Sequence, residues 1–296
     1  MILITGASGQ TGTRLVKLLR ARGEAVRGLA RSAASASRLS ALGAEAMEGD
    51  MRDVAVLRRA LRGVDRVYHI APSLAADEET LHRTVIDAAK AAGVRRFVLH
   101  GAIAPFLEDV SFHWAKLKAA LFLYQSGMPY TVLIPTNYMQ NVTWSWPLIA
   151  EHGRWELPYR TDVKLSWVDV DDVAEAAANV LTGSGDDYAT YELAGTDSVL
   201  TRAEIATLMS AALGRKVEAV RVDIDEYLAR AASMPFFARA TRQELDQIRG
   251  MFAHYDAVGC PAGNGRTLSM LLGRPATSYR QFVGRLAAGS AAPAPA

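Results

Sequence analysis

The sequence predicts an α/β, Rossmann-type fold: a doubly wound parallel sheet with a smaller C-terminal substrate-binding region. Three observations predict it. The chain opens with an apolar strand that runs directly into a glycine-rich turn, strand-like and helix-like segments then alternate six times, and the connections between them are short. Such alternation is typical of a parallel sheet covered by helices on both faces. Right-handed crossovers between parallel strands favour the doubly wound order.

The opening segment, residues 1–12, reads MILITGASGQTG and predicts a dinucleotide cradle. Gly6 permits a tight turn, Gly9 lets the backbone approach a pyrophosphate, and Gly12 lets the helix pack closely on the strand. Free N–H groups at the helix start would face the phosphates. The spacing G-x-x-G-x-x-G is one residue longer than G-x-G-x-x-G, and an ordinary glycine-rich turn is the alternative interpretation. The predicted cradle residues are Gly6, Ser8, Gly9, Gln10, Thr11 and Gly12.

The next elements follow from the spacing of apolar residues. We expect strands over residues 25–30, 44–47, 64–70, 95–100 and 130–134. We expect the later helices of this half around residues 54–61, 81–89 and 113–125. Ligands of such sheets bind at the carboxyl ends of the strands. Residues at these ends should therefore line one crevice: Arg31, Asp50, Met51, Ala71, Pro72, Gly101, Pro135 and Thr136.

Beyond residue 136 the pattern becomes aromatic and irregular. All five tryptophans lie between Trp114 and Trp167. Tyr138, Trp144 and Trp155 are expected either to wall a flat apolar substrate pocket or to pack a long loop against the sheet. Further strands are expected at 164–170, 188–194 and 217–222 and a helix at 173–181. Residues 225–254 are expected to be mostly helical with a break at Pro235. A capping box between Thr201 and Glu204 predicts the start of another helix.

These elements suggest a division of the chain. Residues 1–136 form the expected dinucleotide-binding Rossmann domain, and 164–183 are expected to return to it. Residues 137–284 form the expected substrate-binding α/β region. The last stretch, 285–296, is expected to be a disordered tail because its composition is mostly Ala, Gly, Ser and Pro.

Composition limits the classes of partner. The net charge is only +2 and the arginines are scattered, which argues against nucleic acid or a membrane surface as partner. The single cysteine, Cys260, allows no intramolecular disulfide, and no apolar run reaches membrane-spanning length. We therefore expect a cytoplasmic monomer or homodimer that binds a small molecule. No spacing of His, Cys and acidic residues predicts a metal, and Asp171 and Asp172 are expected to cap a helix.

The end of the second strand predicts which dinucleotide binds. An NAD site has an acidic residue there, which binds the ribose hydroxyls and repels a 2′-phosphate. This chain has Ala30, Arg31 and Ser32 instead. A guanidinium and a hydroxyl suit a phosphate monoester, so NADP(H) is predicted over NAD(H), with a solvated arginine as the alternative. Asp50 and Met51 would flank the adenine.

Over nearly its whole length, to about Gly284, the chain resembles the NmrA-like group of atypical short-chain dehydrogenases/reductases. The residues that carry the resemblance are ITGASGQTG, Gly49-Asp50, His113-Trp114 through Lys116, 126–131, Pro135, 138–141, 168–174, 191–193 and 200–206. The resemblance implies NADPH-dependent quinone, dye or azo reductases, or redox-sensing proteins without catalysis. The motifs are specific for the group and not for a substrate.

The chain departs from the short-chain dehydrogenase pattern at the catalytic positions. The Tyr expected four residues before Lys116 is replaced by Phe112. His100 and Gly101 stand where a Ser often ends the fifth strand, and Ile134 stands where an Arg is common. Acceptors that take a hydride with little help, such as quinones, azo compounds or conjugated enones, are therefore expected rather than simple alcohols.

Three residues are the candidate catalytic groups. By resemblance, Lys116 binds the nicotinamide ribose, and its charge would stabilise a reduced acceptor. His100 and His113 are candidate proton donors because histidine titrates near neutrality. A surface lysine and structural histidines are the alternatives.

The sequence supports one main hypothesis and two rivals. The first is an NADPH-dependent oxidoreductase that transfers a hydride to a flat conjugated acceptor. A non-catalytic NADP(H)-sensing regulator is the second, and the missing Tyr and Ser favour it. An isomerase or dehydratase on the same fold is the third.

Overall fold

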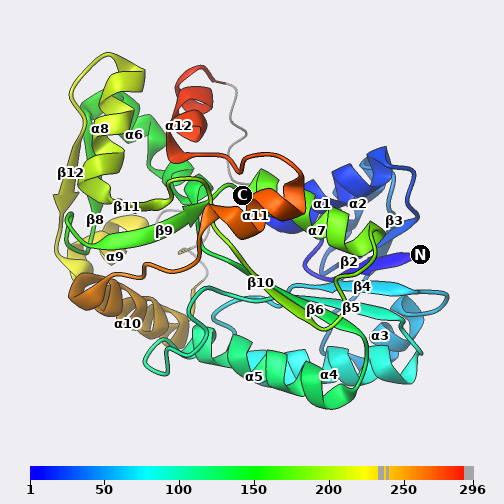
Figure 1. The fold of residues 1–296 in the computed structure, drawn as a ribbon. Helices are drawn as coiled ribbons and strands as arrows, with labels where there is room; N and C mark the ends of the chain where they lie inside the picture. The colour runs from blue at the N-terminus through cyan, green and yellow to red at the C-terminus, as the bar shows by residue number, and fades with distance from the viewer. Residues whose placement is uncertain (233–236, 238–239, 290–296) are drawn as a thin grey trace.

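A seven-stranded parallel sheet forms the centre of the computed structural model, which describes residues 1–232, 237 and 240–289 (Figure 1). From one edge to the other its strands are β10 (Ala189–Leu193), β6 (Tyr130–Pro135), β5 (Arg96–His100), β4 (Arg66–His69), β1 (Ile2–Ile4), β2 (Val26–Ala30) and β3 (Glu45–Glu48). The chain reverses its direction of winding between β1 and β4, which is the point where doubly wound sheets bind ligands. The predicted fold class is confirmed.

Helices cover both faces of this sheet, and each face has its own apolar core. One face carries α1 (Gln10–Ala21), α2 (Ala33–Ala41), α7 (Val170–Thr182) and α11 (Gly265–Leu272). The other carries α3 (Val54–Ala60), α4 (Glu78–Ala91) and α5 (Ser111–Ser126). Strand β1 is wholly buried between the layers, whereas β3 at the edge is largely exposed and has a glutamate at each end. Charged side chains at an edge discourage pairing with another chain.

The second half of the chain returns to the large sheet more than once. Helix α7 packs against α1, β10 pairs in parallel with β6, and α11 packs on α7 and β10. Strand β9 (Lys164–Val168), in contrast, lies in a separate three-stranded sheet with β7 (Asn137–Tyr138) and β11 (Val199–Thr201). Elements from beyond residue 136 therefore complete the layer that the first half begins.

The remaining elements form the smaller region around a third apolar core. Its elements are the 3₁₀ helix η1 (Met139–Trp144), α6 (Trp146–His152), β8 (Arg154–Leu157), α8 (Arg202–Leu213), β12 (Glu218–Arg221), α9 (Ile224–Ala231), α10 (Arg242–Val258) and α12 (Tyr279–Ala287). The predicted capping box of Thr201 and Glu204 is confirmed at the start of α8. Residues 285–287 belong to α12, so the expectation of disorder is wrong for them; Pro235 and residues 290–296 lie outside the described part.

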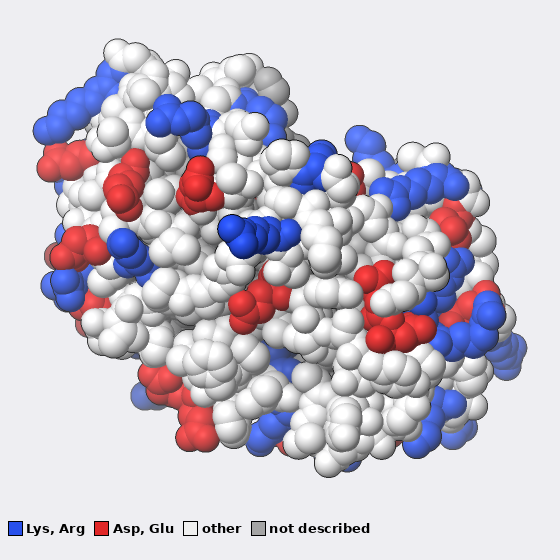
Figure 2. All heavy atoms as spheres, viewed as in Figure 1, with Lys and Arg blue, Asp and Glu red and all other residues white. Residues whose placement is uncertain are grey.

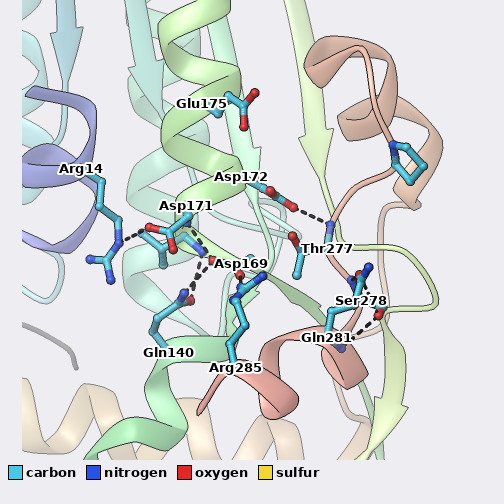
Figure 3. A network of polar contacts seen from close by, with 12 residues as sticks. Arg14, Gln140, Asp169, Asp171, Asp172, Glu175, Thr277, Ser278, Gln281 and Arg285 are labelled. Carbon is cyan, nitrogen blue, oxygen red and sulfur yellow. Dashed lines mark hydrogen bonds and ion pairs between the residues drawn. The ribbon is translucent and has the colours of Figure 1, made fainter. Parts of the chain in front are cut away.

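A cluster of acidic residues at the start of α7 ties the two regions together (Figure 3). The buried Asp169 is the N-cap: its carboxylate accepts hydrogen bonds from the Asp171 amide and from Gln140, and it pairs with Arg285 of α12. Asp171 pairs with Arg14 of α1 at 2.6 Å. The cap is thus Asp169 rather than Asp171 or Asp172, which lie in the first helical turn and bind other segments.

Asp172 binds the segment that leads into α12. Its two carboxylate oxygens accept hydrogen bonds from Arg274 at 2.7 Å and from the Thr277 amide at 2.6 Å. Asp172 is 2% exposed. A buried carboxylate with two donors fixes the position of the segment that provides them.

Two further observations concern the surface. On the face shown in Figure 2, basic and acidic side chains of the described residues are interspersed. Within the described ranges, no helix has the length and apolar character needed to cross a membrane.

Candidate functional site

A crevice of about 600 Å³ opens at the carboxyl ends of β1, β4, β5 and β6. Its lining includes all six residues of the predicted glycine cradle. Ala71, Gly101, Pro135 and Thr136 line it as well, as the sequence predicts for strand ends. The structure thus brings most of the predicted cofactor residues to one cavity.

The glycine turn has the geometry of a phosphate cradle. Gly6 has a φ of +61°, a conformation that other residues rarely adopt. A Cβ atom at Gly12 would lie 2.3 Å from the Gly6 carbonyl oxygen, so only glycine allows α1 to approach the strand this closely. Gly9 is the N-cap of α1 without a side-chain cap, which leaves the first amides of the helix open to the crevice.

Two polar atoms beside the cradle fit a bound dinucleotide. Gln10 Oε1 and Thr136 Oγ1 are buried and have no hydrogen-bond partner among the described residues. Both residues line the crevice. Buried polar atoms without partners are unusual in native proteins, and a ligand with hydroxyl or amide groups would supply the missing bonds.

Four predicted cofactor residues lie outside this lining. Arg31 is exposed after β2. Asp50 pairs with Arg52 at 3.3 Å, and Met51 is buried in the core beneath α3 and α4. Pro72 follows Ala71 but does not line the crevice.

Lys116 is a buried residue of the crevice wall rather than a surface lysine. It is 3% exposed and its ammonium donates a hydrogen bond to Glu78 Oε1 of α4. The same Lys116 Nζ atom lies 3.5 Å from His82 Nε2. Its neighbour Lys118, in contrast, makes an exposed pair with Glu79 at 2.8 Å. Lys116 therefore has a fixed position in the wall of the crevice.

A buried chain of polar groups continues from this pair toward β1. His82 Nε2 lies 3.4 Å from Glu78 Oε1, and His82 Nδ1 lies 3.0 Å from His69 Nε2. His69 Nδ1 in turn lies 2.8 Å from Thr5 Oγ1, one residue before the glycine turn. Burial lowers the pKa of His69 and of His82 well below the ordinary value, so both rings are neutral. This chain links the anchor of Lys116 to the strand that carries the cradle.

His100 is held between two tyrosine hydroxyls. Its Nδ1 lies 2.6 Å from Tyr68 Oη and its Nε2 lies 2.7 Å from Tyr138 Oη. Tyr138 Oη also lies 3.2 Å from Thr11 Oγ1 in the first turn of α1. Burial lowers the pKa of His100 to about 3 and raises the pKa of Tyr138 to about 12. His100 is therefore neutral near pH 7.

His113 also lines the crevice and is neutral near pH 7. Its Nδ1–H donates to the Ala104 carbonyl oxygen at 3.4 Å, and burial lowers its pKa to about 4. The structure brings all three candidate catalytic residues to the crevice. Neither histidine, however, has the extra proton of an imidazolium.

A second pocket of about 310 Å³ adjoins the first and is strongly aromatic. Trp144 lines both pockets, Tyr138 lines the first and Trp155 the second. Met251 and Tyr255 of α10 line both as well, and sequence reasoning did not find them. The periodicity of α10 shows which residues are buried on one face but does not show what that face contacts.

Fold and site together define a Rossmann protein with a dinucleotide cradle and an aromatic pocket beside it. The chain belongs to the NmrA-like family, whose model matches residues 1–272. The family resemblance seen in the sequence is therefore confirmed.

Relatives with assigned activities match the chain over almost its full length. It is 31% identical to the NAD(P)H azoreductase of Xenophilus azovorans, over 95% of this chain and 96% of that protein. It is also 31% identical to quinone oxidoreductase 2 of Escherichia coli strain K12, over 97% and 98%. The crystal structure of the E. coli NADPH-dependent quinone oxidoreductase complexed with NADPH superposes with a TM-score of 0.82 at 29% identity, covering 97% of this chain and 99% of that one.

Proposed function

We propose that this protein is an NADPH-dependent oxidoreductase that reduces flat conjugated acceptors such as quinones and azo compounds. The observation that carries the proposal is the continuity of the two pockets. The glycine cradle opens into the first, and the aromatic second pocket shares a wall with it at Trp144. A cavity beside the cofactor site is what a reductase needs and what a protein that only senses the cofactor does not need. The azoreductase and quinone oxidoreductase relatives support the same activity.

The cradle residues would hold the pyrophosphate on the open amides of α1. Arg31 would pair with the 2′-phosphate, with Asp50 and Met51 near the adenine. The nicotinamide would lie among Ala71, Gly101, Pro135 and Thr136, where Thr136 Oγ1 has a hydrogen bond to offer. The bound cofactor would supply the hydride.

The protein's own groups prepare the acceptor side. Tyr138, Trp144 and Trp155 would hold a planar ring system by stacking and by excluding water. Lys116 lines the crevice and is almost completely buried, so its charge would stabilise an acceptor that becomes negative. Glu78 keeps that ammonium in place.

The proposal includes the setting in which the protein works. We place it in the cytoplasm as a monomer or homodimer with an aromatic or conjugated small molecule as substrate. The sequence has a single cysteine, Cys260, and so allows no intramolecular disulfide, which agrees with a reducing compartment.

Following NADPH absorbance with a panel of quinones, azo dyes and enones tests the function. We expect oxidation of NADPH that depends on both enzyme and acceptor. Tight NADPH binding with no turnover of any acceptor would contradict the proposal and favour the cofactor-sensing regulator. Turnover of a substrate without net NADPH oxidation would favour an isomerase or dehydratase.

The predicted role of Arg31 has a separate test. Arg31→Ala should raise the KM for NADPH by about tenfold or more, because a charged hydrogen bond to the phosphate is lost. The KM for NADH should change much less. Equal changes for the two cofactors would remove Arg31 from the phosphate site.

A further inference from the structure

A chain of three aromatic side chains runs from the core to the crevice wall. The fully buried Tyr68 of β4 contacts His100 of β5 at 2.6 Å, and His100 contacts Tyr138 at 2.7 Å. Tyr138 and His100 both line the crevice, as does Thr11, which is 3.2 Å from the Tyr138 hydroxyl. The chain therefore ends at a phenol that reaches the candidate site.

The hydrogen bond of the buried Tyr68 hydroxyl determines which atoms of His100 and Tyr138 carry a proton. Within the described residues the Tyr68 hydroxyl has its hydrogen bond to His100 Nδ1, so it satisfies its proton by donating to that nitrogen. His100 then has its own proton on Nε2 and donates it to the Tyr138 oxygen. The phenolic proton of Tyr138 is consequently directed toward Thr11 Oγ1 or into the crevice, away from the imidazole.

This arrangement of hydrogen-bond donors also stabilises the phenolate that Tyr138 becomes when it loses its proton. The phenolate oxygen would accept two hydrogen bonds, one from His100 Nε2–H and one from the Thr11 hydroxyl. Fixed donors aimed at a developing oxyanion act strongly where water is excluded. His100 therefore serves as a positioning residue, and Tyr138 is the group that can transfer a proton.

The other tyrosine that lines the crevice already uses its hydroxyl proton in a hydrogen bond within the protein. Tyr255 donates its hydroxyl proton to Asn137 Oδ1 at 3.0 Å. The position that would hold a catalytic Tyr in related dehydrogenases is Phe112, which also lines the crevice and has no proton to give. Among the crevice phenols in the described part of the chain, Tyr138 is thus the one with a proton available to an acceptor.

Acceptors differ in how much they need this proton. When a hydride adds to one nitrogen of an azo bond, the π electron pair moves to the other nitrogen and creates a strongly basic hydrazide anion. That nitrogen takes the Tyr138 proton: the O–H bond breaks, an N–H bond forms, and the phenolate later regains a proton from water entering the open crevice. A quinone receives the same hydride and becomes a delocalised, weakly basic phenolate-type anion, which can gain its proton from water after release.

We propose that Tyr138 is the proton donor for acceptors whose reduced form is a strong base, such as azo compounds, and that quinones depend on it far less. The inference rests on the proposed reductase function and adds a catalytic residue and a preference among acceptors. In this proposal Tyr138 replaces His100 and His113 as the proton donor, because both histidines are neutral and His100 donates its proton to Tyr138.

Tyr138→Phe tests this directly because it removes the hydroxyl and keeps the ring on the pocket wall. We expect kcat for an azo dye to fall by about 100-fold or more, the usual contribution of a general acid. For a benzoquinone we expect a fall of less than about fivefold, because its anion is a weak base. Equal falls for both acceptors, or no fall for the azo dye, would overturn the proposal. A wild-type protein that reduces neither acceptor would instead contradict the reductase function itself.

Tyr68→Phe is the matched variant. Tyr68 is the buried end of the hydrogen-bonded series Tyr68–His100–Tyr138, where no acceptor can reach. Without the Tyr68 proton, His100 can move its proton to Nδ1 and accept the Tyr138 proton at Nε2. We expect the azo-to-quinone ratio of kcat to fall by about tenfold, the worth of one redirected hydrogen bond. A purely structural role for Tyr68 would lower both rates together and leave the ratio unchanged. D₂O should also slow azo reduction by the wild type more than quinone reduction, and the reverse order would contradict the proposal.

Discussion

Two lysines of α5 show how burial changes the contribution of a lysine–glutamate ion pair to stability. Lys118 and Glu79 form an exposed ion pair, with 39% and 45% of their side chains accessible. Lys116 and Glu78 form the equivalent pair between the same two helices, but each is 3% exposed. An exposed pair contributes little because water and salt screen it. Breaking a buried pair leaves a charge without its partner.

Glu78→Gln should therefore be costly where Glu79→Gln is not. The first change leaves the Lys116 ammonium buried without its counter-charge, and we expect the free energy of unfolding to fall by about 3–5 kcal/mol. Because the ammonium is also displaced, kcat for any acceptor should fall by about tenfold. Urea unfolding and NADPH oxidation measure the two effects.

The matched variant Glu79→Gln should change the free energy of unfolding by less than about 0.5 kcal/mol. Similar losses in the two variants would show that burial of the Lys116 pair has no special consequence.

At the scale of elements, sequence reasoning succeeds where structure depends on neighbouring residues. The strands of the first half are found within a few residues, because apolar runs closed by Gly or Pro are local features. The pairing of β10 with β6 is not visible in this way, since it joins segments about fifty residues apart in the chain. For the same reason Met251 and Tyr255 could not be assigned to the site: whether an apolar helix face meets a core or a pocket depends on distant segments.

The contact between α1 and the glycine turn yields a prediction for that element. Gly12→Ala would place a Cβ atom 2.7 Å from Ala7 Cα as well as against the Gly6 carbonyl, so α1 must shift. We expect a loss of about 2 kcal/mol in the free energy of unfolding and a weaker Kd for NADPH, since the cradle amides move with the helix.

Gly284→Ala is the control for this substitution, because it lies on the exposed side of α12 with nothing within 4 Å of the added Cβ. It should leave NADPH binding unchanged and slightly raise stability, as alanine favours helix. Normal NADPH affinity in Gly12→Ala would show that the loop tolerates a displaced helix.

For the whole molecule, four buried histidines dominate the response to acid. Burial lowers the pKa of His100 to about 3 and that of His113 to about 4, and it places those of His69 and His82 well below the ordinary 6.5. As the pH falls, the unfolded chain binds these protons first. Folding stability is thus fully present above about pH 6.5 and is lost as the pH falls toward 4 and 3.

We expect the free energy of unfolding to decrease below pH 6.5 by up to about 1.4 kcal/mol per pH unit for each such histidine. Urea titrations at pH 7, 6 and 5 measure this slope. His113→Gln should reduce the slope, whereas the same change at the exposed His152 should not. A stability that is constant from pH 7 to 5 would contradict the picture of neutral buried rings.

The chain passes repeatedly between the large sheet and the smaller region: β10 and α11 return to the sheet, and α12 leaves it again. At the start of α7, Asp169 and Asp172 bind α12 and the segment that leads into it, and Asp171 binds α1 (Figure 3). In such a chain no single cut separates the described residues around the cofactor cradle from those around the acceptor pocket. We therefore expect a change of acceptor to come from substitutions in the pocket walls, among them Trp144 and Met251, with the scaffold left unchanged.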